Sequence, residues 1–189
     1  MNQNANPSPE PTIRALFCYP PSSTYADDPD GWWSWPGNDF DAEGRQQEYM
    51  EVLNRMGRRL EMIITTDESS VWTAEQIDDW VSRLEDDRPD GLLIVLFANH
   101  SRAMADRLCE ASLRLEIPVV LYIALGVCHG PGTSFRSYRR AGVHFIMSLE
   151  NFEAIERGLR MIRDGEPLGQ GPWPATPPAA VPAAQASGD

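Results

Sequence analysis

Five short apolar segments alternate with four longer segments in which apolar residues recur at helical spacing. The third and fourth apolar segments are almost continuously hydrophobic, as strands are when a parallel sheet is covered on both faces. Strands of this length that alternate with helices predict right-handed crossovers and a parallel sheet. The strands are expected at residues 13–19, 60–66, 91–98, 118–125 and 143–148.

The fold class that follows is α/β. We predict a three-layer sandwich around a five-stranded parallel sheet, with the flavodoxin-like or Rossmann-like strand order 2-1-3-4-5. The four helices are expected at about 42–59, from Thr73 onward, from Ser101 onward and at 149–163, with Gly165 just past the last one. Thr73 and Gln76 have the spacing of a capping box. The residues expected to face the core from these helices are Tyr49, Val52, Leu53, Met56, Ile77, Trp80, Val81, Leu84, Met104, Leu108, Ala111, Leu115, Phe152, Ile155, Leu159 and Ile162.

The two ends of the chain differ in composition from its centre. Residues 1–11 are polar and rich in proline, and residues 166–189 are rich in proline and alanine. Such segments bury too little apolar surface to offset the entropy of ordering, so we expect disorder on both sides of a single domain at 12–165. Trp173 is either a docking aromatic or a stray residue in this tail.

Charge narrows the choice of partners. The net charge is −12, and all sixteen basic residues are arginine. This balance disfavours a nucleic-acid backbone and an anionic membrane surface, and the lack of lysine removes Schiff-base and phosphate-loop chemistry. Cys18 and Cys109 lie within apolar periodic segments and are expected to be small buried residues. No signal segment or membrane-spanning run is visible, so we predict a cytoplasmic location.

In open parallel sheets, ligands bind beyond the carboxyl ends of the strands. The segment after the first strand, 20–41, contains GWWSWPGNDFD, and a connection of this length within a compact domain is usually functional. Its tryptophans could stack on a sugar, fold back onto the core or form a subunit interface. The residues placed by the topology at this edge, and expected to bind a ligand, are Trp33, Trp35, Asn38, Asp39, Asn99, His100, His129, Glu150 and Asn151.

The signals for catalysis and for metal binding are weak. His100, His129 and Asp39 are the candidates for acid–base chemistry, and Cys128 beside His129 could complete a metal set. No pair has paired-ligand spacing, so we assign no metal site. GVCHGPG lacks the GxGxxG order of a dinucleotide-binding fingerprint, so that fingerprint is absent. PPSST after the first strand is a doubtful phosphate loop. A receiver domain would need an aspartate at the position of Asn99 and a lysine after the fifth strand. The chain has neither, so we reject this class of protein.

Four segments together resemble the N-terminal Rossmann-like domain of the L-fucose/L-arabinose isomerase superfamily. They are WSWPGNDFDAEGRQQEY (33–49), DGLLIVLFANHS (90–101), VVLYIALGVCHGPG (119–132) and HFIMSLENFEAIERGLRMI (144–162). The resemblance covers about residues 12–165, and its distinctive pieces are W-P-G…D-x-E-G and S-x-E-N.

The resemblance implies a wall of a pocket that holds a sugar or polyol, formed by the ligand-binding residues named above. In that superfamily, a Mn²⁺ or similar ion assists proton transfer and is held mainly by later domains. We therefore expect that those catalytic domains are absent from this chain and that the chain itself binds no cofactor. Mn²⁺ is expected only if a catalytic partner completes the site.

Three functions are open from the sequence. The first is a sugar- or polyol-binding domain that is not catalytic alone, with a homo-oligomer or a separate catalytic subunit as its possible partner. The second is a small carbohydrate-active isomerase or hydrolase that uses His100, His129 and Asp39. The third is an interaction domain that docks through its tryptophan-rich segment.

Overall fold

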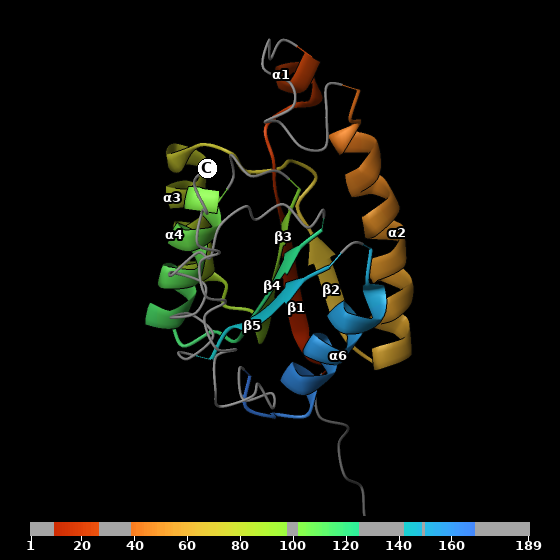
Figure 1. Ribbon diagram of the computed structural model, residues 1–189. Coiled ribbons are helices and arrows are strands. Elements are labelled where there is room, and N and C mark those ends of the chain that lie inside the picture. Colours follow the sequence, from red (N-terminus) through yellow and green to blue (C-terminus); the bar gives the residue numbers. More distant parts are fainter. Residues whose placement is uncertain (1–9, 27–38, 98–101, 125–141, 149, 169–189) are drawn as a thin grey trace, which may run out of the picture.

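A five-stranded parallel sheet forms the centre of the protein (Figure 1). The computed structural model describes residues 10–26, 39–97, 102–124, 142–148 and 150–168. All neighbouring strands are parallel and follow the order β2-β1-β3-β4-β5, which confirms the predicted fold class. The strands are β1 (Thr12–Cys18), β2 (Ile63–Thr66), β3 (Gly91–Leu96), β4 (Val119–Ile123) and β5 (His144–Met147).

Helices cover both faces of the sheet. Figure 1 shows α2 and α6 on one face, α3 and α4 on the other, and α1 beyond the carboxyl end of β1. The helices are α1 (Ser22–Ala26), α2 (Ala42–Leu60), α3 (Ala74–Asp86), α4 (Arg102–Arg114) and α6 (Phe152–Arg163). Within the described residues, no helix is both long and apolar enough to cross a bilayer.

The central strands explain the continuously apolar segments of the sequence. Every residue of β3 and β4 is buried. Leu93 and Val95 join the core under α2 and α6, whereas Leu92 and Ile94 join the core under α3 and α4. Because successive side chains of a strand point to opposite faces, a strand between two helical layers needs apolar residues at every position.

Two predicted boundaries are wrong by about three residues. The second strand begins at Ile63 and not at residue 60, because Leu60 completes the buried stripe of α2 and Glu61, at φ 55°, ends that helix. The last helix begins at Phe152 and not at residue 149. Asn151 caps it, since the Asn151 side chain accepts a hydrogen bond from the Ala154 N–H at 3.0 Å.

Two further details differ from the sequence prediction. The segment after β1 was expected to be a loop, yet it contains the short helix α1. Helix α4 turns a slightly different face to the sheet than predicted: Met104, Ala111 and Leu115 are only half buried. The fully buried residues of α4 are Ala105, Leu108, Cys109 and Ser112.

Other predictions are confirmed. Thr73 and Gln76 form the expected capping box at the start of α3. Cys18 and Cys109 are free and fully buried, and burial raises the pKa of both thiols above its ordinary value. Ser101, the expected cap of α4, lies outside the described residues. Leu168, three residues beyond the predicted domain end, is buried.

A close approach of α6 to the sheet at Gly158 yields a stability prediction. A Cβ added at Gly158 would lie 2.9 Å from the Val120 Cγ2 and 2.9 Å from the His144 Cδ2. Alanine normally stabilises a helix interior relative to glycine by about 1 kcal/mol. Here we expect Gly158→Ala to lower the free energy of unfolding by about 1–3 kcal/mol, because the helix must move off the sheet.

Urea unfolding followed by circular dichroism measures this change. Arg157→Ala, at an exposed position of the same helix, is the control and should change the free energy of unfolding by less than about 0.5 kcal/mol. A Gly158→Ala protein that is more stable than the wild type would contradict the proposed close packing.

Candidate functional site

Three of the nine predicted ligand-binding residues lie in the described part of the chain. Asp39 is exposed and stands two residues before Asp41, the N-cap of α2. Glu150 and Asn151 connect β5 to α6. The other six lie outside the described residues, so their role stays a prediction; they are Trp33, Trp35, Asn38, Asn99, His100 and His129.

Glu150 is held in place by α2. Its carboxylate forms an ion pair with the Arg45 guanidinium, which also contacts Glu48 and lies over the Tyr49 ring at 5.6 Å from the ring centroid. The backbone of Glu150 is left-handed, at φ 46°, a conformation that costs a non-glycine residue roughly 1 kcal/mol or more. The ion pair therefore ties the β5–α6 connection to α2, and a ligand at Glu150 would have to compete with Arg45.

Asn151 already has two structural roles. Its backbone N–H donates to the Tyr122 hydroxyl at 2.7 Å, and its side-chain oxygen caps α6. These bonds fix the start of α6 over the end of β4. The geometry therefore shows Asn151 as a helix cap, and its predicted contact with a ligand remains untested.

Aromatic rings pack beneath this part of the carboxyl edge. Tyr49 lies 5.3 Å from Phe97, 6.3 Å from Tyr122 and 4.7 Å from Phe152, measured between ring centroids. The Tyr49 hydroxyl is buried without a hydrogen-bond partner in the described chain, and burial raises its pKa above the ordinary value. These rings form part of the core between the sheet and helices α2 and α6.

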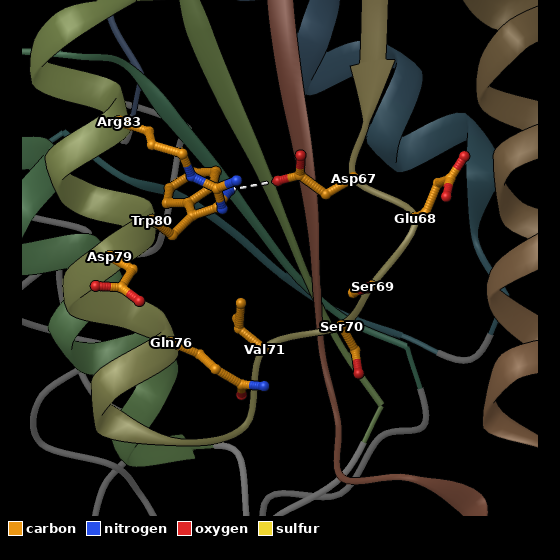
Figure 2. Close-up of a pocket in the computed structure, with 9 residues that line it drawn as sticks. All are labelled: Asp67, Glu68, Ser69, Ser70, Val71, Gln76, Asp79, Trp80 and Arg83. Carbon is orange, nitrogen blue, oxygen red and sulfur yellow. Dashed lines mark hydrogen bonds between the residues drawn. The ribbon is translucent and has the colours of Figure 1, made fainter.

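An open cavity lies at the carboxyl end of β2, between the β2–α3 connection and α3 (Figure 2). Its volume is about 590 Å³, within the range of about 300–1,000 Å³ that is usual for small-molecule sites. It is lined by Asp67, Glu68, Ser69, Ser70, Val71, Gln76, Asp79, Trp80 and Arg83. The sequence prediction assigned no ligand-binding residue to this connection, although the run DESS directly after a strand places two carboxylates and two hydroxyls at the ligand-binding edge.

The wall of this cavity is fixed by a buried amide. The Gln46 side-chain nitrogen donates to the carbonyls of Asp67 and Glu68 at 3.0 and 3.2 Å, and its oxygen accepts from the Tyr19 hydroxyl at 2.6 Å. The Ser70 hydroxyl donates to the Tyr19 carbonyl at 3.0 Å. The connection after β2 is thus bonded to α2 and to the end of β1, so the cavity is shaped before any ligand arrives.

Trp80 and Asp67 meet across the cavity. The indole N–H of Trp80 donates to the Asp67 carboxylate at 2.5 Å, as Figure 2 shows. The Trp80 side chain is buried in the core under α3 and α4, so this bond satisfies an indole N–H that would otherwise be costly to bury. The bond also fixes the position of one carboxylate in the lining.

Four lining side chains keep their hydrogen-bonding capacity. Glu68, Ser69, Asp79 and Arg83 have no side-chain hydrogen bond or ion pair within the described residues. Glu68 and Ser69 come from the connection and Asp79 and Arg83 from α3, and all four are exposed to solvent (Figure 2). The cavity therefore offers carboxylate acceptors, a hydroxyl and a guanidinium donor to a small polar ligand.

The residues after β1 do not form a phosphate loop. The Ser22 hydroxyl and backbone N–H both donate to the Glu43 carboxylate, and the Ala42 N–H donates to the Ser22 hydroxyl oxygen at 2.8 Å. Partial burial opposes ionisation of Glu43, but the bonds from Ser22 outweigh it and hold the pKa of Glu43 below its ordinary value. This serine is thus committed to a carboxylate, which would repel a phosphate.

The described ranges contain no group of three or more histidine, cysteine, aspartate or glutamate side chains that could hold a metal ion. Cys128 and the two loop histidines lie outside those ranges. No protein family profile and no curated protein sequence matches this chain.

The buried amide gives a prediction for the cavity wall. Gln46→Ala should lower the free energy of unfolding by about 2–4 kcal/mol, because it removes the donor of two carbonyls and the acceptor of the Tyr19 hydroxyl. Amide hydrogen exchange at Val71, whose N–H donates to the Phe17 carbonyl, should become faster.

The neighbouring Gln47, which is exposed, supplies the matched control. Gln47→Ala should leave both stability and exchange nearly unchanged. Equal effects of the two substitutions would show that Gln46 does not hold the wall.

Tyr19 gives a prediction about pH. Burial, with a smaller contribution from the Glu43 charge, raises the pKa of Tyr19 to about 12. Between pH 10 and 12 the folded protein keeps this proton while the unfolded chain loses it, so the free energy of unfolding should fall as pH rises, by up to about 2 kcal/mol.

Urea titrations at pH 9, 10, 11 and 12 test this linkage. Tyr19→Phe has no proton to lose, so its stability should decline less steeply than that of the wild type over this range. Parallel declines would mean that Tyr19 titrates normally in the folded protein.

Proposed function

We propose that this protein binds a small hydroxyl-rich ligand, a sugar or a polyol, in the cavity between the β2–α3 connection and α3. The observation that carries the proposal is the set of unpartnered polar side chains in that cavity. Glu68, Ser69, Asp79 and Arg83 can all bond to a ligand without breaking a bond within the described protein.

The chemistry of the lining suits hydroxyl groups. A sugar hydroxyl both donates and accepts, so carboxylates and a guanidinium recognise it better than a purely apolar wall does. Val71 and Trp80 are the apolar residues of the lining, and both are buried, so the polar side chains are the groups that a ligand would contact most. The fixed connection after β2 limits the entropy lost on binding.

The location also supports the proposal. The cavity opens at the carboxyl edge of the sheet, where doubly wound α/β domains bind ligands. It lies one strand away from the switch point between β1 and β3 that the sequence indicated. The resemblance to the N-terminal domain of L-fucose/L-arabinose isomerases favours the same class of ligand on independent grounds.

The proposed activity is binding, and no catalytic step is assigned to the described residues. Asp39, the described member of the acid–base candidates, is not in the lining of the cavity. In this proposal, any isomerisation would be carried out by a separate catalytic subunit, which would also bring the Mn²⁺ that such chemistry uses.

Isothermal titration calorimetry with a panel of pentoses, hexoses and inositols tests the proposal. We expect saturable binding, and we expect Asp79→Asn to weaken it about tenfold, because a charged acceptor is replaced by a neutral amide. Asp78→Asn is the matched control, since Asp78 pairs with Arg107 and does not line the cavity.

The control should lower affinity by less than about twofold. No heat with any ligand of the panel, from a protein whose circular dichroism shows it folded, would overturn the proposed function. Equal losses in the two variants would place the ligand outside this cavity.

A further inference from the structure

We infer that this cavity selects hydroxyl-rich ligands that carry a basic nitrogen, such as amino sugars and amino polyols, over sugar phosphates and sugar acids. The inference rests on the proposed function, because it names the class of ligand for the same cavity. It follows from the charged side chains that line the cavity and from which of them have a partner of opposite charge.

Three carboxylates and one guanidinium line the cavity. Glu68 and Asp79 have no cationic partner within the described residues, and Asp67 bonds only to the neutral indole of Trp80. Arg83 is the single basic residue of the lining. The acidic side chains of the lining therefore outnumber its basic side chain by three to one.

A phosphate or carboxylate would meet the carboxylates of the lining on entry, whereas an ammonium group would be attracted by them.

Three N–H groups at the start of α3 are already bonded within the protein. A helix N-terminus attracts anions through its free N–H groups. Here the Gln76 N–H donates to the Thr73 hydroxyl at 3.2 Å, and the Gln76 side-chain oxygen accepts from the N–H groups of Thr73 and Trp72 at 3.1 and 2.9 Å. These bonds leave the helix start fewer donors for an anion, and the carboxylates of the lining are the charged groups that outnumber the guanidinium.

Four probes of similar shape test the preference by calorimetry at pH 6.5 and low salt. They are glucose, glucosamine, N-acetylglucosamine and glucose 6-phosphate. We expect glucosamine to bind about tenfold more tightly than glucose, and glucose 6-phosphate more weakly than glucose. N-acetylglucosamine keeps the nitrogen without its charge and should lose the advantage. At 0.5 M NaCl the advantage of glucosamine should shrink, because salt screens charges in an open cavity.

Two variants give effects of opposite sign. Asp79→Asn should remove most of the advantage of glucosamine over glucose, and Arg83→Gln should increase it, because it removes the repelling cation. Asp78→Asn should leave the ratio unchanged. A merely structural role of Asp79 or Arg83 would weaken both sugars alike.

The outcomes separate the inference from the proposed function. Binding of glucose and other neutral sugars with no gain for glucosamine would overturn the inference and leave the proposed function standing. Tighter binding of glucose 6-phosphate than of glucosamine would do the same. No binding of any sugar, neutral or basic, to the folded protein would overturn both.

Discussion

The double burial of the central strands is the constraint on which the rest of this structure depends. Strands β3 and β4 are buried at every residue, and β1 is nearly so, which is stable only if helices cover both faces of the sheet. Parallel strands then require that each connection crosses the sheet from its carboxyl end to its amino end. The connections that leave the carboxyl ends are therefore the part of the fold that is free to carry polar groups, and every candidate site found here lies on them.

A buried amide adds to this constraint a polar element that shapes the candidate site. Gln46 lies on the inner face of α2, among apolar residues, and it bonds to the carbonyls of Asp67 and Glu68 and to Tyr19. An amide group in such a place is tolerated because its donors and acceptor are satisfied. In return, it holds the connection after β2, from which the Asp67 carboxylate reaches the Trp80 indole of α3. The rigid core and the polar edge are thus linked through one residue.

The carboxyl edge divides into two regions with different chemistry. Near β5, Glu150 and Asn151 are engaged with Arg45, Tyr122 and the start of α6, so the polar groups there mainly fix the protein to itself. Near β2, the lining of the cavity includes polar side chains that no part of the described chain satisfies. Polar groups that are exposed at a cavity and unbonded within the protein are available to a ligand, whereas polar groups bonded within the protein contribute to its stability. This difference is why the proposed function is placed beside β2.

The sequence by itself determined the fold, because each of its signals is local. Three such signals depend only on the spacing of neighbouring residues: the continuous burial of the central strands, the buried stripe of α2 and the capping box of α3. The structure confirms all three. The same local patterns misplaced the start of β2 and of α6, since Leu60 and Asn151 suit both neighbouring elements until packing assigns them to one.

Only the tertiary structure decided where polar groups gather. Asp67 and Trp80 are thirteen positions apart, and Gln46 is more than twenty positions from the carbonyls that it holds. Contacts of that range depend on how helices rest on the sheet, which no local pattern encodes. The sequence contains an acidic, hydroxyl-rich segment after the second strand, but only the packing of α2 and α3 around that segment makes it the wall of a cavity.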